Sequence, residues 1–191
     1  GATAHSGAGR IGRLRMRPMT LLERGVGEPT VSLRRLLAGD RLALSGESSL
    51  GLSDYVNEIV ASGLPAFRNL EGRTLRFQLD SYLRNVVDRD VPELGLRVRK
   101  PEALLSWLRA YAAATSTTAS YSQILDAATP GQYDKPARPT SIAYRDVLTD
   151  LWLLDPVPAW IPSRNILTRL GQTPKHHLAD PALAARLLGL G

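Results

Sequence analysis

The 191-residue chain contains no cysteine, which excludes disulfide-stapled scaffolds, thiol catalysis and cysteine-ligated metal sites. This composition fits a reducing compartment, and we expect a cytoplasmic location. No run approaches the ~18 consecutive apolar residues of a membrane-spanning helix. The basic residues near the start are not followed by the apolar segment of a signal peptide. We therefore expect no membrane partner.

The sequence also lacks the motifs of several enzyme classes. It has no G-x-x-x-x-G-K-[ST] segment, so the chain does not itself carry a P-loop, and no serine lies in a G-x-S-x-G elbow. Gly7–Gly12 matches G-x-G-x-x-G, but the dinucleotide fingerprint needs a strand before it and a helix after it. Because a strand pattern follows here instead, we interpret this segment as a loop that enters a strand.

Two groups of ionisable residues invite a catalytic or metal-binding interpretation. His176 and His177 are adjacent, so on a strand they point to opposite faces and do not converge on one ion with Asp180. We predict a structural role for the three, with Asp180 as a helix cap and no metal bound. Asp88 and Asp90 are two residues apart near the end of a predicted helix. Their different faces indicate a solvated helix end and no acid/base pair.

The net charge of +6 is concentrated at the start of the chain. Residues 1–41 contain eight arginines and three acidic residues (+5), whereas the remainder carries 16 basic and 15 acidic residues (+1). Within Ile11–Met19 the apolar residues alternate with arginine, a pattern typical of a half-buried strand with its guanidinium groups on one face. These arginines are Arg13, Arg15 and Arg17, preceded by Arg10. Contact with phosphates and a solvated strand face both explain them.

Hydrophobic spacing predicts a mainly α-helical fold after this segment. From Gly72 the apolar residues follow helical spacing as far as Val87, and Pro101 suits the first position of a later helix. The other expected helices cover 32–38, 53–60, 120–128, 140–153 and 181–189, and short extended pieces are expected at 157–161 and 175–178.

Three helices followed by a β-hairpin are the order of a winged helix, here from about Lys100 to Asp180. The candidate nucleic-acid contacts on the wing are Arg164, Arg169 and Lys175. The expected recognition helix at 140–153 has a net negative charge, which opposes phosphate attraction. A DNA reader and a packing module therefore both remain open.

Five segments in order carry a resemblance that runs over essentially the whole chain. They are His5–Gly25, Asp54–Pro65 (D-Y-V-N-E-I-V-A-S-G-L-P), Leu79–Asp90 (L-D-S-Y-L-R-N-V-V-D-R-D), Leu108–Ser116 and Lys175–Leu187 (K-H-H-L-A-D-P-A-L-A-A-R-L). Together they resemble bacterial predicted ATPases of the AAA-like superfamily that bear the domain of unknown function 4143. The first segment is similar to the one that follows the sensor-1 strand in those proteins.

The resemblance implies a middle fragment of a larger ATPase. A core with Walker A and Walker B motifs would precede Gly1, and ATP and Mg would be bound there. In this alignment Arg10 occupies a position near the nucleotide γ-phosphate, where arginine stabilises the charge on the transferred phosphoryl group. Without the core the chain itself is expected to be catalytically inactive, and its partner is the ATPase core of the same polypeptide.

We therefore expect a remnant of the ATPase core at 1–28 with a short N-terminal strand, a helical lid at 29–95 and a winged-helix domain at 96–191. In this interpretation the lid and winged helix respond to nucleotide state. Two alternatives belong to other classes. The first is a winged-helix DNA-binding regulator, and the second is a protein-interaction module, which the near-neutral charge after residue 41 favours.

Overall fold

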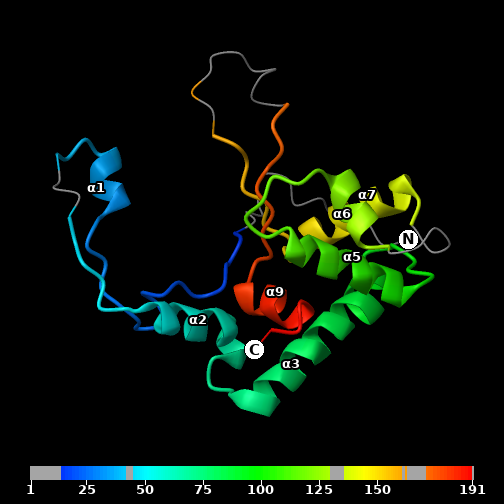
Figure 1. The fold of residues 1–191 in the computed structure, drawn as a ribbon, viewed down its shortest axis with the longest axis horizontal. Coiled ribbons are helices and arrows are strands. Elements are labelled where there is room, and N and C mark those ends of the chain that lie inside the picture. Colours follow the sequence, from blue (N-terminus) through cyan, green and yellow to red (C-terminus); the bar gives the residue numbers. More distant parts are fainter. Residues whose placement is uncertain (1–13, 42–44, 130–135, 161, 163–170, 191) are drawn as a thin grey trace, which may run out of the picture.

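The longest amphipathic pattern of the sequence forms the long helix α3 (Gly72–Asn85), as predicted. Leu75, Leu79 and Leu83 recur at helical spacing and are buried on one face. The chain then continues through a π-helical turn, η2 (Val86–Asp90), into the short helix α4 (Val91–Glu93). The computed structural model describes residues 14–41, 45–129, 136–160, 162 and 171–190, and among these it is mainly helical (Figure 1).

Helix α5 (Pro101–Ala113) lies at the centre of the core. Pro101 occupies the first turn as the sequence predicts, because its missing N–H is not needed there. Trp107 and Tyr111 have no exposed surface, and their rings stack at a centroid distance of 5.4 Å. The Trp107 indole N–H donates to Ser141 Oγ at 2.9 Å, which ties α5 to α7 (Arg138–Asp150). Burial of these large side chains supplies much of the hydrophobic stabilisation of the domain.

Helix α6 (Tyr121–Ala127) follows α5 after a short turn. Ser120 caps it, since its hydroxyl accepts from the Gln123 backbone N–H while the Gln123 side chain accepts from the Ser120 backbone N–H. After α7 the segment 154–157 runs antiparallel to 175–178 through two isolated bridges, and Thr115 forms a parallel bridge with His176. No β-sheet is formed by the described residues.

The last helix, α9 (Pro181–Leu187), packs against α2 (Leu52–Val60), α3 and α5. It brings the end of the chain beside α2, which lies more than 100 residues earlier. Asp180 caps α9 by accepting from the Ala182 backbone N–H at 2.8 Å, which confirms the predicted cap. This helix therefore joins the early and late parts of the chain.

The strand predicted at Ile11–Met19 is wrong for its described part, residues 14–19, which pair with no strand. Leu14 and Met16 are 85% and 81% exposed, whereas Arg15 is partly buried. Alternation predicts that the apolar residues face inward, but the described chain offers no sheet for them to pack on. The guanidinium of Arg15 instead finds an acidic partner inside the molecule.

Residues 26–41 and 45–51 belong to an arm that extends away from the helical body and carries α1 (Leu33–Leu37) (Figure 1). Helices α1 and α2 contain no buried residue, although both lie close to their predicted ranges. The 3-10 turn η1 (Pro65–Phe67) lies between α2 and α3. On α2 the apolar residues Val56 and Ile59 are 50% and 43% exposed. The amphipathic pattern thus predicted these helices correctly, although much of the apolar face of α2 stays exposed in the described chain.

Candidate functional site

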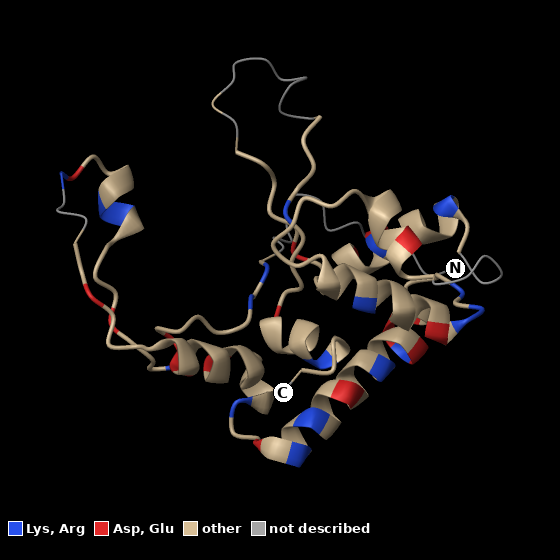
Figure 2. Ribbon diagram, viewed as in Figure 1, with Lys and Arg blue, Asp and Glu red and all other residues tan. Residues whose placement is uncertain are grey.

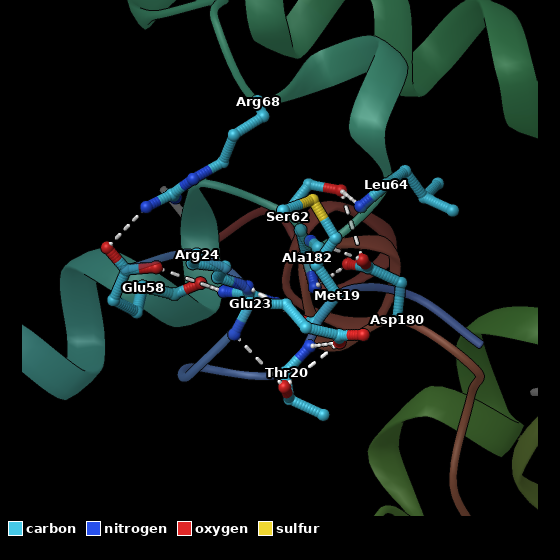
Figure 3. A network of polar contacts seen from close by, with 11 residues as sticks. Met19, Thr20, Glu23, Arg24, Glu58, Ser62, Leu64, Arg68, Asp180 and Ala182 are labelled. Atoms are coloured by element: carbon cyan, nitrogen blue, oxygen red, sulfur yellow. Dashed lines mark hydrogen bonds and ion pairs between the residues drawn. The ribbon is translucent and has the colours of Figure 1, made fainter. Parts of the chain in front are cut away.

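A polar network joins the N-terminal segment to α2 and to the loop that follows it (Figure 3). The Arg24 guanidinium donates to the Met19 carbonyl at 2.9 Å, to the Glu58 carbonyl at 2.8 Å and to the Glu58 carboxylate at 3.1 Å. Arg68 donates to the other carboxylate oxygen of Glu58 at 2.9 Å. The Arg24 side chain is only 6% exposed. One carboxylate therefore holds two arginines that lie on either side of it in the sequence.

The turn that presents Arg24 is fixed by its own residues. The Glu23 carboxylate accepts from the backbone N–H and the hydroxyl of Thr20, at 2.8 and 2.9 Å, and Thr20 Oγ1 accepts from the Glu23 N–H. This is the reciprocal pattern of a capping box. Gly25 closes the turn with φ +72°, a conformation that side chains disfavour.

The second part of the network surrounds the carboxylate of Asp180, which is fully buried (Figure 3). Besides capping α9, Asp180 accepts from the Gly63 N–H at 2.6 Å and from the Ser62 hydroxyl at 3.0 Å. Ser62 has a left-handed backbone (φ 64°) and is itself buried. A charged group without exposure is tolerated only where donors satisfy it, and here three do.

Gly63 is the point at which the N-terminal segment touches the body. Its carbonyl accepts from the Met19 N–H at 2.7 Å. A Cβ at this position would collide with Nη2 of Arg24 and lie 2.9 Å from the Met19 carbonyl oxygen. Only glycine leaves room for this approach. We call the set formed by Met19, Arg24, Glu58, Gly63 and Asp180 the junction.

A second attachment lies between the N-terminal segment and the chain that follows α7. Asp155 receives the Arg17 Nε and Nη2 atoms, both at 2.9 Å, and Arg15 Nη1 at 3.1 Å. The Arg15 guanidinium also lies 5.8 Å from the centre of the Trp152 ring. Both arginines, for which the sequence left phosphate contact and a solvated face open, thus have an acidic partner in the same chain.

Two carboxyl pKa values follow from these contacts. The hydrogen bond from Arg68, and then that from Arg24, hold the pKa of Glu58 below its ordinary value although partial burial opposes this. Arg186 donates to Asp80 through Nε and Nη2, both at 2.7 Å, and lowers the pKa of Asp80 in the same way. Both carboxylates are therefore ionised at neutral pH and act as anchors for arginine.

Only some of the phosphate and nucleic-acid contacts predicted from the sequence lie among the described residues. Arg10, Arg164 and Arg169 lie outside the described residues, as does Arg13. Lys175 is exposed, and its backbone pairs with Val157 through N–H···O bonds of 2.9 and 2.8 Å.

The two histidines have different environments, as the prediction of opposite faces requires. His176 is fully buried, its Nε2 lies 2.7 Å from the Ala119 carbonyl, and its ring meets the edges of Tyr111 and Tyr121. His177 is only partly buried. In the described ranges no three acidic or histidine side chains are grouped to hold a metal ion. Asp88 and Asp90 lie on the π-turn η2.

A groove of about 340 Å³ lies between α6, α7 and residues 171–174. Its basic residues are Arg138 and Arg145, and Ser141 and Gln172 also line it. The Arg145 guanidinium bonds Asp146 at 2.7 Å and covers the Tyr121 ring at 5.1 Å. Part of its charge is therefore already neutralised by its neighbour.

Sequence reasoning missed the junction, although every one of its members lies in a segment on which the resemblance rests. A usable signal was present in Thr20–Glu23, since T-x-x-E is a capping-box pattern. The ion pairs had no comparable signal. Arg24 and Glu58 are 34 residues apart, and Gly63 and Asp180 are 117 apart.

No curated protein and no solved structure matches this chain. None of the described helices has the length and apolar character needed to cross a lipid bilayer. A model of a protein family described as a domain of unknown function, DUF8612, matches residues 52–191 and so covers α2 through α9. Because this match includes well over half of the sequence, the chain belongs to the DUF8612 family.

Proposed function

We propose that this chain is the coupling part of a nucleotide-dependent switch protein and catalyses no reaction itself. In this proposal the segment 14–25 moves with nucleotide state and passes that movement to the helical body. The observation that carries the proposal is the double attachment of this segment. Arg15 and Arg17 hold it to Asp155, and Arg24 holds it to Glu58. Ten residues of chain thus contact both the segment that follows α7 and helix α2.

The order of elements supports a winged-helix domain at 96–191. Helices α5, α6 and α7 are followed by two segments, 154–157 and 175–178, that run antiparallel. Thr115 lies between α5 and α6 and forms a parallel bridge with His176, so a third short piece of chain pairs with these two segments. Three helices with this hairpin are the composition of a winged helix. In the same proposal residues 1–28 are the remnant of an ATPase core, and 29–95 are the lid.

The residues of this chain do not by themselves fit ATP and Mg. The sequence has no P-loop, and the described residues contain no cluster of acidic side chains that would hold a metal ion. The proposal therefore assigns ATP, Mg and the chemistry to an ATPase core elsewhere in the polypeptide. What this chain contributes is attachment, and Arg10 remains a proposed phosphate contact.

Hydrogen exchange in the polypeptide that contains both this chain and the proposed core tests the coupling. We expect ATP to change exchange both in residues 14–25 and in α7. The substitution Asp155→Asn removes the charge that holds Arg15 and Arg17, and we expect the ATP response of α7 to disappear while that of 14–25 remains. Asp150→Asn, an exposed change at the end of the same helix, is the matched control.

Three results would contradict the proposal. The first is ATP turnover by residues 1–191 alone, because this chain is proposed to lack the catalytic core. The second is an unchanged ATP response of α7 in Asp155→Asn, because the attachment at Asp155 would then transmit nothing. Loss of all nucleotide response in the wild-type polypeptide would also reject the proposed core.

The groove beside α7 favours a second candidate function, DNA binding. Arg138 and Arg145 line it, and the wing residues Arg164, Arg169 and Lys175 follow in sequence. Phosphate contacts by arginine and lysine make such binding strongly salt-dependent. A duplex DNA titration at low and moderate salt tests this function. Binding that weakens steeply with salt and with Lys175→Ala supports it, and no binding at low salt rejects it.

The exposed apolar face of α2 favours the third candidate, a protein-interaction module. Leu52, Tyr55, Val56 and Ile59 follow helical spacing, and each is at least 40% exposed. Sedimentation of the chain with the proposed ATPase core, supplied as a separate polypeptide, tests this function. Co-sedimentation that Val56→Asp abolishes supports it, and the absence of a complex rejects it.

A further inference from the structure

A groove of about 350 Å³ opens where α3, α5 and α9 meet, away from the junction and from Asp155. Each helix contributes one arginine, and these are Arg84, Arg109 and Arg186. Asp80 is the acidic residue in the lining. The side-chain charge around the groove is therefore +2, from three guanidinium groups and one carboxylate. Figure 2 shows basic positions on all three helices.

The three arginines differ in how they are held. Arg186 is fixed by its bidentate contact with Asp80, both bonds being 2.7 Å. Arg84 and Arg109 are exposed and make no hydrogen bond or ion pair with another described residue, although the charge of Arg84 helps to lower the pKa of Asp80. Long side chains normally lose rotamer freedom when they bind a ligand. Arg186 has already lost this rotamer freedom, and the guanidinium groups of Arg84 and Arg109 lie beside it without hydrogen bonds to described residues.

The charge balance indicates the class of ligand. Guanidinium forks match carboxylate and phosphate oxygens through paired N–H donors. Asp80 and the carbonyl end of α9 at Leu187 offset part of the positive charge. A single carboxylate would gain little from the remaining positive charge, whereas a multiply charged anion can engage both Arg84 and Arg109. The volume is also large enough for two linked phosphoryl groups.

We propose that this groove is a binding site for a diphosphate group, with Arg84 and Arg109 as its ligands and Arg186 as the fixed third donor. Asp80 acts as a positioning residue. Its carboxylate orients Arg186 and, because it has no hydrogen-bond donor, does not itself bind the anion. The site lies wholly within residues matched by the family model. It is independent of the proposed coupling function, since none of its residues belongs to the junction.

Isothermal titration calorimetry of the whole chain with inorganic pyrophosphate tests the site, and ADP serves as a second probe. We expect saturable binding at low ionic strength that salt weakens. Arg84→Ala and Arg109→Ala should each reduce affinity about tenfold, the usual effect of losing one charge-assisted contact. The matched control is Arg73→Ala, which removes the same charge from the exposed first turn of α3 outside the groove.

The two probes distinguish the sources of the diphosphate. Equal affinity for pyrophosphate and ADP, with the same sensitivity to Arg84→Ala, supports recognition of the diphosphate alone. Tighter binding of ADP with that sensitivity also supports the site and identifies a nucleotide as the source. No binding of either probe would overturn the proposal. So would binding that Arg73→Ala weakens as much as Arg84→Ala, since this would reflect overall charge. Circular dichroism verifies that each variant is folded.

Discussion

The Arg24 guanidinium and the Glu58 carboxylate form a largely buried ion pair at 3.1 Å, although 34 residues separate them in the sequence. Arg24 also donates to the Glu58 backbone carbonyl, so a single side chain contacts both the main chain and the side chain of one residue of α2. Arg68 contacts the second carboxylate oxygen. The segment before α1 is thereby attached to the domain that the family model matches.

Removal of the Glu58 carboxylate should destabilise the protein substantially. In Glu58→Ala the buried Arg24 keeps only backbone acceptors, and an uncompensated buried charge is costly. We expect the free energy of unfolding to fall by about 2–4 kcal/mol, measured by urea denaturation. Glu93→Ala breaks the exposed pair with Arg89 and should have little effect. Equal losses in the two variants would contradict the structural role of the junction.

Replacement of Asp180 by its neutral isostere should also weaken the fold. In Asp180→Asn one side-chain oxygen still caps α9, but an amide N–H₂ then faces the Gly63 N–H and the Ser62 hydroxyl. The lost acceptor leaves a buried donor unsatisfied, and we expect a loss of about 1–3 kcal/mol. Thermal unfolding compares this variant with Asp88→Asn, an exposed carboxyl on η2. Unchanged stability of Asp180→Asn would show that the donors find other partners.

A methyl group at position 63 should release the N-terminal segment. The added Cβ of Gly63→Ala collides with Arg24 and crowds the Met19 carbonyl, so these atoms must move apart. We expect a cost of about 1–3 kcal/mol. Trypsin should cleave after Arg24, which Gly25 follows, faster than in the wild type. Gly51→Ala, whose Cβ would meet its nearest neighbour, Asp54, at 3.6 Å, is the control. An unchanged cleavage rate at Arg24 would mean that the segment is not held by this approach.

The stability of the protein should fall as the pH drops below about 4.5. The pKa values of Glu58 and Asp80 are lowered in the folded state from ordinary values of 4.5 and 3.8. A lowered carboxyl pKa contributes stability that is complete above the unfolded value and is lost as the pH falls through the folded one. Urea denaturation between pH 3 and 7 should give a shallower pH dependence for Glu58→Gln than for the wild type. The same slope in both proteins would mean that Glu58 does not contribute.

The sequence determined the helices because their causes are local. The spacing of Leu75, Leu79 and Leu83 specifies the buried face of α3, and Ser120 and Asp180 cap the helices that they precede. It predicted the strand at 11–19 wrongly in its described part, since alternation shows which residues share a face and does not show what lies opposite. Arg15 and Arg17 face Asp155, which follows 138 residues after Arg17.

Only the tertiary structure decided which polar groups meet. Arg24 and Glu58, Gly63 and Asp180, and Asp80 and Arg186 are paired across 34, 117 and 106 residues, and local patterns contain no information about such pairs. The same folding leaves Arg84 and Arg109 exposed, without a hydrogen bond or ion pair to another described residue, and places them beside the anchored Arg186. The sequence thus determined that the chain is helical and arginine-rich at its start. Packing determined which arginines hold the fold together and which two remain exposed in the proposed anion site.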